Sequence, residues 1–149
     1  IVLGHNRLSI LDLSVAGNQP FYSANGRFVL VFNGEIYNYL EIKKELESQF
    51  EFKTTSDTEV LLHAYMAWGE DCLEKCNGMF AFAIWDEQEK ILFAARDRFG
   101  EKPFYYFFDG VQFLFASEMK AFKYKKSSKG FAEIVNEYNR LKEAAAKKM

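Results

Sequence analysis

Residues 28–38 read Phe-Val-Leu-Val-Phe-Asn-Gly-Glu-Ile-Tyr-Asn. The first five of them, Phe28–Phe32, are apolar without any polar alternation, a pattern that predicts a strand covered on both faces. Just before them, Asn25-Gly26 can adopt the positive φ angles of a tight turn, so a hairpin with the short segment Phe21-Tyr22 is expected. After the strand, the polar residues Asn33-Gly34-Glu35 lead the chain toward a helix.

The first expected helix spans Tyr39 to Gln49. Asn38 stands immediately before it and is a typical N-cap residue, whose side-chain oxygen can accept a free backbone N–H of the first turn. Glu41 follows three residues later and completes a start that is similar to a capping box. The apolar residues of this helix fit a single face only in part.

The second expected helix has a stronger start signal. Ser56-Asp57-Thr58-Glu59 has the form of a capping box, in which Ser56 accepts a backbone N–H and Glu59 reaches back to the start of the helix. Apolar residues then recur at helical spacing as far as Trp68, and Gly69 can end the helix. A short helical piece is expected at residues 71–75.

The sequence changes character after Gly78. Four segments rich in aromatic and aliphatic residues predict an antiparallel meander, with turns at Glu87–Glu89 and at Asp109-Gly110. One more strand is expected near the N-terminus and one more helix in the C-terminal tail. Strands early and late with helices between them predict an α+β layered architecture in a single domain. The expected strands are 7–13, 79–85, 90–95, 104–108 and 112–116, and the expected tail helix is 131–148.

Composition is that of an ordinary globular domain. The 149 residues are 49% hydrophobic and 27% charged, which excludes a disordered tail protein, a collagen-like fibre and a coiled-coil rod. The 17% aromatic content favours β-sheet. No apolar run is long enough to span a membrane and no leader opens the chain, so a cytoplasmic protein without a membrane partner is expected.

Charge is unevenly distributed along the chain. The formal net charge is −2, which gives no general basic footprint for nucleic acid. From Met119 onward, however, nine Lys/Arg and three Asp/Glu residues give a net charge of +6. This basic tail is interpreted either as an interaction arm or as the solvated face of a helix, and the dilution of its charges by Ala, Ser and Tyr favours the helix.

The two cysteines, Cys72 and Cys76, are four residues apart and could share one helix face. A metal site would need histidine partners, but His5 and His63 lie far away in the sequence. Free structural thiols in a reducing compartment are therefore expected.

Four segments could carry chemistry, and each also has an ordinary structural interpretation. The Asn33 amide and the Gly34 N–H are two neutral donors that could hold a developing oxyanion, or they could form an Asn-Gly turn. Arg7 could clamp a carboxylate or could be a surface residue. Asp57 could hold an ammonium group or could serve only the helix start. Residues 96–103 could bind phosphate, although a salt-bridged turn between strands fits them better.

Taken together, six segments in this order resemble the class II glutamine amidotransferase (glutaminase) domain of glutamine-hydrolysing asparagine synthetases. Any one of the six is weak evidence, but the ordered set is specific and covers roughly Val2 to Phe122. Residues 123–149 do not match the family pattern, so the predicted organisation is a partial amidotransferase domain at 1–122 followed by a basic helical tail. The matching segments are 4–10, 32–38, 56–59, 77–83, 95–100 and 115–118.

The resemblance implies an N-terminal-nucleophile hydrolase fold, a four-layer αββα sandwich of antiparallel sheets, here lacking its first strand. It implies that Asn33 and Gly34 form the oxyanion hole, and that Asp57 with help from Glu35 holds the charged amino-acid end of glutamine. It further implies that Arg7 binds the glutamine α-carboxylate. The main chain of Leu8, Ile10 and Leu11 would line the same pocket.

The family nucleophile is a cysteine at the mature N-terminus, whose own α-amine serves as the base. The first residue here is Ile1, so a binding half-site without its nucleophile and negligible glutaminase activity are expected for this chain alone. No phosphate-binding loop follows Phe122, so no cofactor is expected in this chain, and ATP and Mg²⁺ are expected only in a separate synthetase domain. An uncovered sheet edge would favour a homodimer.

Three hypotheses remain open on the sequence alone. The chain is a fragment of a glutaminase domain whose parent makes asparagine, or a remnant domain that binds glutamine or only itself. In the third, a partner chain supplies the nucleophile strand of a split enzyme.

Overall fold

The computed structural model describes residues 1–5 and 18–126 of the chain, which forms two compact units, Ile1–Phe104 and Tyr105–Met149. This division falls before the end of the family resemblance at Phe122, whereas the sequence predicted one continuous domain up to that point. The family boundary itself stays a prediction. The expected strand at 7–13 and the expected helix at 131–148 lie outside the described residues.

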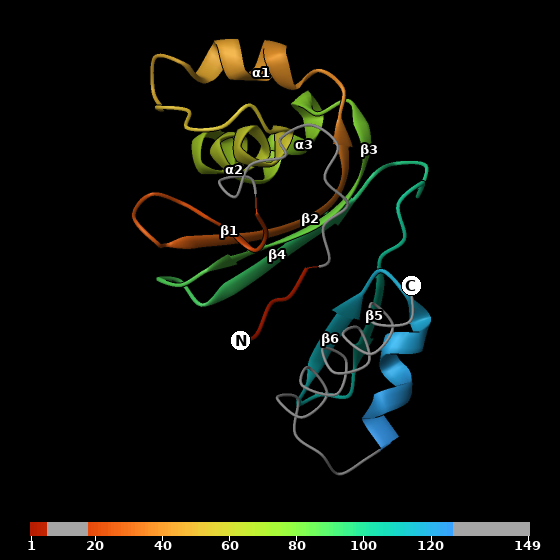
Figure 1. The fold of residues 1–149 in the computed structure, drawn as a ribbon. Coiled ribbons are helices and arrows are strands. Elements are labelled where there is room, and N and C mark those ends of the chain that lie inside the picture. The colour runs from red at the N-terminus through yellow and green to blue at the C-terminus, as the bar shows by residue number, and fades with distance from the viewer. Residues whose placement is uncertain (6–17, 127–149) are drawn as a thin grey trace, which may run out of the picture. The chain divides into compact units, whose positions relative to one another are not determined.

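The first unit contains a four-stranded antiparallel sheet with the order β1-β2-β3-β4 (Figure 1). The long strands β2 and β3 pair along their whole length, with Phe32 opposite Phe82. A short turn joins each of these two strands to an outer strand, as the hairpin signals predicted. The strands are β1 (Phe21–Tyr22), β2 (Phe28–Ile36), β3 (Gly78–Asp86) and β4 (Ile91–Arg96).

Helices cover one face of this sheet (Figure 1). The elements are α1 (Tyr39–Leu46), α2 (Asp57–Trp68), the 3₁₀ helix η2 (Gly69–Asp71) and α3 (Cys72–Lys75). Side chains alternate across a strand, so Leu30, Phe32 and Ile36 of β2 share one face and join the core with α1 and α2. Val31 and Ala83 on the other face are buried as well. The predicted coverage of both faces of β2 is therefore confirmed.

The start of α2 follows the predicted capping box only in part. Ser56 Oγ accepts the N–H of Thr58 at 3.1 Å, as expected. Glu59, however, does not reach back to Ser56; its buried carboxylate accepts the N–H groups of Lys53 and Thr54 and the Thr54 hydroxyl. The turn that precedes the helix brings these three donors to Glu59, while Ser56 N–H is satisfied by Thr54 Oγ1.

Asn38 lies at the N-cap position of α1 but makes no side-chain capping bond, so that prediction was wrong. Its side chain bonds instead to the Lys75 carbonyl and the Asn77 N–H, at 2.9 Å each. These two groups lie where α3 ends and β3 is about to begin, and Asn38 joins them to the exit of β2. The helix itself ends at Leu46 and passes into turns before Gln49.

The second unit holds a separate hairpin, β5 (Tyr105–Phe108) and β6 (Phe113–Ala116), followed by the 3₁₀ helix η3 (Met119–Lys126). The predicted turn at Asp109-Gly110 is confirmed, with Gly110 at a φ of 91°. The predicted four-strand meander was wrong, because β4 and β5 do not pair. After β4, Asp97 accepts several backbone N–H groups and folds the chain into a compact turn instead of a hairpin.

His63 of α2 is buried between two phenylalanine rings. Its ring is stacked on Phe50 at 4.6 Å between centroids and meets Phe52 edge-on at 4.8 Å. Burial lowers the pKa of His63, and the nearby Glu59 charge opposes this only in part. The folded state therefore favours the neutral ring.

This burial predicts that the free energy of unfolding falls as the pH drops below about 6.5, the ordinary pKa of histidine, because the unfolded chain then binds a proton that the folded chain excludes. Urea titrations at pH 7.5 and 5.5 measure the difference. His63→Phe should reduce this pH-dependent difference in the free energy of unfolding. The other histidine of the chain, His5, is left unchanged in that variant. An equal pH dependence in both proteins would contradict this account.

Candidate functional site

The candidate site lies on the edge of β2 that faces away from β3, beyond the start of β1 at Phe21. No described strand pairs with this part of the edge, and it is called the free edge below. In an antiparallel pair, successive residues direct their backbone groups alternately toward and away from the neighbouring strand. Phe28 accepts from Ser23 N–H, and Phe32 bonds to the Gln19 side chain, so the even-numbered residues of β2 face away from β3. Gly34 belongs to this set. Its N–H and C=O therefore point to the edge of the sheet and not into the β2–β3 ladder.

The hydrogen bonds of β3 also indicate that the backbone groups of Gly34 face away from β3. Phe80 stands across from Gly34, and its N–H and C=O bond to Asp97 on the far side of β3. Within residues 1–5 and 18–126, no group forms a hydrogen bond with the Gly34 N–H. Among the described residues, this N–H is therefore a donor without a partner, near the end of β2.

Only glycine fits at position 34. Its φ is 155°, and a Cβ added there would lie 2.2 Å from the Met79 carbonyl oxygen and 2.6 Å from Phe80 Cα. These contacts are far too short for a side chain to enter. The close approach of β2 to β3 therefore excludes every residue except glycine from this position.

Asn33 is paired with Ala81 and is half-buried. Its side chain lies on the sheet face opposite Phe32, because side chains alternate along a strand. The two donors therefore differ in direction: the Gly34 N–H points outward from the edge, and the Asn33 amide stands on one face beside it.

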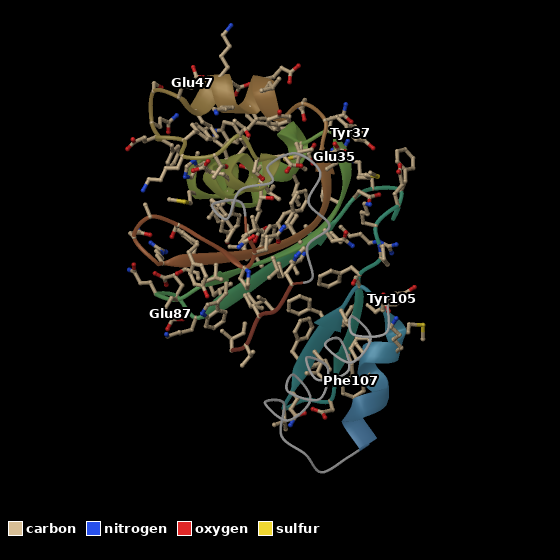
Figure 2. The ribbon with its side chains drawn as sticks, viewed as in Figure 1. Glu35, Tyr37, Glu47, Glu87, Tyr105 and Phe107 are labelled. Atoms are coloured by element: carbon tan, nitrogen blue, oxygen red, sulfur yellow. The ribbon has the colours of Figure 1, made fainter. Side chains whose placement is uncertain are left out.

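Asp57 reaches the same edge two residues further along. Its Oδ2 accepts the Ile36 N–H at 3.0 Å, although Asp57 is the first residue of α2. Burial raises the pKa of Asp57; hydrogen bonds from the Ile36 and Thr58 N–H groups lower it, and the Glu35 charge raises it further. Glu35 lies at this end of β2 (Figure 2).

The site is therefore acidic at one end. Among the described residues, no Lys or Arg forms an ion pair with Asp57 or Glu35. A ligand cation placed beside these carboxylates would offset the unfavourable burial of Asp57. The edge of β2 thus offers neutral donors at Asn33 and Gly34 and negative charge at Glu35 and Asp57.

The chain is similar to a well-defined group of proteins. A family model described as a glutamine amidotransferase domain matches residues 1–148. This chain belongs to the glutamine amidotransferase domain family. The matched range includes the basic tail that the sequence analysis set apart, and the domain boundary at residue 122 stays a prediction.

Individual relatives show which members of this family the chain is similar to. The chain is 48% identical over 124 residues to asparagine synthetase [glutamine-hydrolyzing] 3 of Bacillus subtilis, which covers 81% of this chain and 20% of that protein. It is 46% identical over 134 residues to putative asparagine synthetase [glutamine-hydrolyzing] 2 of Methanocaldococcus jannaschii, covering 80% of this chain and 26% of that protein. The chain thus spans about a fifth to a quarter of the curated relatives it matches.

A solved structure confirms the fold. The glutamine phosphoribosylpyrophosphate amidotransferase from B. subtilis matches 70% of this chain and 25% of its own, with a TM-score of 0.60 and 33% identity. The α+β class and the N-terminal-nucleophile hydrolase fold predicted from the sequence are confirmed. The predicted loss of the first strand is not tested by this match.

Within this amidotransferase domain, the structure brings together Asn33, Gly34, Glu35 and Asp57, four of the residues singled out in the sequence. The other predicted site residues, Arg7, Leu8, Ile10 and Leu11, lie outside the described part of the chain. The roles of all eight stay predictions. Sequence reasoning missed Gln19, whose side chain bonds to Phe32 two residues before Gly34.

The turn after β4 is structural. Arg96 donates to the main-chain carbonyls of Gly100 and Lys102, and the exposed Arg98 pairs with Glu74 at 3.0 Å. The guanidinium of Arg96 is thus engaged by the turn itself. This arrangement supports the salt-bridged turn and not the phosphate site.

Cys72 is buried and Cys76 is half-buried. Both are free thiols, and burial raises the pKa of Cys72 to about 12 and that of Cys76 to about 11. Thiols that resist deprotonation are poor nucleophiles. No cluster of potential metal ligands occurs in the described residues. A search of the same residues also finds no helix that could cross a membrane.

Proposed function

We propose that this domain binds L-glutamine at the free edge of β2 and serves glutamine hydrolysis, to glutamate and ammonia, in a longer asparagine synthetase-like protein. The observation that carries the proposal is the Gly34 N–H, which has no partner in the described part of the chain. It lies two residues from the Ile36 N–H, which Asp57 accepts. At about 3.3 Å per residue these two positions are roughly 7 Å apart. This spacing suits an amino acid with an ammonium group at one end and a side-chain carbonyl at the other.

Each group has a role that fits its chemistry. The Asn33 amide and the Gly34 N–H would hold the carbonyl oxygen of the glutamine side chain and the negative charge that develops on it when a nucleophile adds. Asp57 and Glu35 would accept hydrogen bonds from the α-ammonium group. Arg7 would bind the α-carboxylate, and the main chain of Leu8, Ile10 and Leu11 would line the pocket.

The nucleophile must come from elsewhere than Cys72 or Cys76, since burial holds both thiols protonated. The family resemblance supplies it as an N-terminal cysteine. Glutaminase inactivity of the 149-residue chain alone therefore stays a prediction, and ammonia release by the purified chain measures it.

We further propose that the remaining parts of the reaction belong to a synthetase domain. The relatives named asparagine synthetases are about four to five times as long as the matched segment. ATP and Mg²⁺ would act in that domain. A homodimer, a cytoplasmic location and a role for the basic tail are further proposals of the same kind.

Calorimetric titration of the 149-residue chain with L-glutamine tests the proposal. We expect binding in the millimolar range, and Arg7→Ala should weaken it about 10- to 100-fold, because a charge-assisted pair with the α-carboxylate is lost. Arg98→Ala, which removes an exposed arginine from the turn after β4, is the matched control and should bind normally.

Absence of heat with the unaltered chain would overturn the proposal and favour a remnant domain that acts by self-association. A chain that binds glutamine but releases ammonia only when a cysteine-first peptide is added would favour the split-enzyme hypothesis.

A further inference from the structure

Gln19 makes an unusual contact with the edge of β2. Its Oε1 accepts the Phe32 N–H at 2.6 Å, and its Nε2 donates to the Phe32 carbonyl at 2.9 Å. One carboxamide thus satisfies both backbone groups of one strand residue. A carboxamide carries a donor and an acceptor side by side on one planar group, which matches the neighbouring N–H and C=O of a strand residue.

The register explains why a side chain is used here. β1 pairs antiparallel with β2, with Phe21 opposite Leu30 and Tyr22 opposite Val29. Continuing this register by two residues places Gln19 opposite Phe32. The regular pairing of β1 begins only at Phe21, so Gln19 is not part of the strand. The Gln19 side chain then replaces the main-chain bonds that a longer strand would make.

The contact made by Gln19 affects Gly34, the next residue of β2 whose backbone groups face outward. Three outward-facing residues of β2 have partners: Leu30 is opposite Phe21, Phe32 bonds to Gln19, and Ile36 bonds to Asp57. The fourth, Gly34, lies between Phe32 and Ile36 and has no described partner. Gly34 therefore lies between two positions that are held by side chains. Both neighbours fix the strand, and neither covers the Gly34 N–H.

We propose that Gln19 is a positioning residue for the oxyanion hole. By ending the main-chain pairing of β1 and holding Phe32, it directs the Gly34 N–H toward the side-chain carbonyl of the ligand. This inference rests on the proposed function, since it assigns Gln19 a role in binding the glutamine carboxamide. It extends that function to a residue outside the eight predicted from the sequence.

The test is an NMR titration of the 149-residue chain, ¹⁵N-labelled, with L-glutamine and with L-norvaline, which has a methyl group in place of the carboxamide. In the unaltered chain, glutamine should shift the Gly34 amide proton downfield and norvaline should not. Gln19→Met removes both bonds at similar size; it should weaken glutamine binding about tenfold, leave norvaline binding within about twofold, and abolish the Gly34 shift.

Two further variants complete the design. Gln49→Met makes the same change at an exposed glutamine after α1 and should leave both titrations unchanged. Gln19→Glu keeps the acceptor for the Phe32 N–H but loses the donor to the Phe32 carbonyl. It should reduce the preference for glutamine over norvaline about threefold or more, and it serves as the test if Gln19→Met does not fold.

The outcomes separate the two proposals. If the unaltered chain binds neither ligand, the proposed function fails, and the role of Gln19 fails with it. If the unaltered chain binds glutamine but the Gln19 variants retain its preference over norvaline and the Gly34 shift, only the positioning role is overturned. Equal weakening of both ligands would also overturn it, since that result indicates a purely structural contact.

Discussion

Asp97→Ala should destabilise the first unit by about 3–5 kcal/mol, because buried backbone donors lose their acceptor together. The Asp97 carboxylate accepts the N–H of Phe80 in β3 and those of Phe99, Glu101 and Lys102 in the following turn. The bond from the Phe80 N–H is buried, so water cannot readily replace it. We expect the loss in urea unfolding of the 149-residue chain, followed by circular dichroism.

The pH dependence of the same interaction has a defined sign. Burial alone would raise the pKa of Asp97, but hydrogen bonds from Lys102, Glu101, Phe80 and Gly100 outweigh it and lower the pKa below its ordinary value near 3.8. The stabilising contribution of Asp97 is therefore fully present above pH 3.8 and is lost as the pH falls through the lowered pKa.

Asp71→Ala is the matched control for Asp97→Ala. Asp71 is exposed at the start of α3 and makes no side-chain capping bond. Its removal should change the free energy of unfolding by less than about 0.5 kcal/mol. Equal midpoints for the two variants would show that the bonds of Asp97 contribute nothing to stability.

Gly34→Ala should abolish measurable glutamine binding and destabilise the fold by about 2–4 kcal/mol. The new methyl group would overlap the Met79 carbonyl and Phe80 Cα, so β2 and β3 must separate at this point. Separation moves the Gly34 N–H away from the position that the proposed oxyanion hole requires. Calorimetry with glutamine and urea unfolding measure the two effects.

Substitutions at two other glycines distinguish backbone strain from steric overlap as the cause of the Gly34→Ala effects. Gly26→Ala introduces a Cβ at a φ of 71° with nothing within 4 Å, so it carries backbone strain of about 1–2 kcal/mol without overlap. Gly78→Ala overlaps the Glu35 carbonyl at 2.1 Å in the same strand pair, so it should destabilise the fold and weaken glutamine binding without any change at residue 34. We expect Gly26→Ala to bind glutamine normally. If Gly34→Ala behaves like Gly26→Ala in both measurements, the assigned role of Gly34 is wrong.

Predictions that depended on neighbouring residues were mostly confirmed. The strand at Phe28–Phe32, the turn at Asp109-Gly110 and the end of α2 at Gly69 all follow from apolar pattern or from residues that tolerate positive φ. Each of these signals acts within a few residues of the chain. For the same reason the ordered motifs were sufficient to identify the family.

Predictions that assigned a partner to a polar side chain were less successful. Asn38 bonds across 37 and 39 residues of sequence to Lys75 and Asn77, and not to its own helix. Glu59 accepts from Lys53 and Thr54 because the preceding turn brings their N–H groups to it. A capping pattern indicates where a helix begins, but several donors compete for each carboxylate or amide once the chain has folded.

Sequence patterns were enough to identify the family, the main strands and helices of the first unit, and the candidates Asn33, Gly34, Glu35 and Asp57. The folded structure was needed to show that these candidates lie at one strand edge and that Gln19 and Asp57 bond to β2 on either side of Gly34. It was also needed to show that the last two strands form a sheet of their own. The two kinds of feature depend on contacts over different distances along the chain. Periodicity and turn preference are set by adjacent residues, whereas an open N–H is defined by which distant side chains reach the strand and which do not.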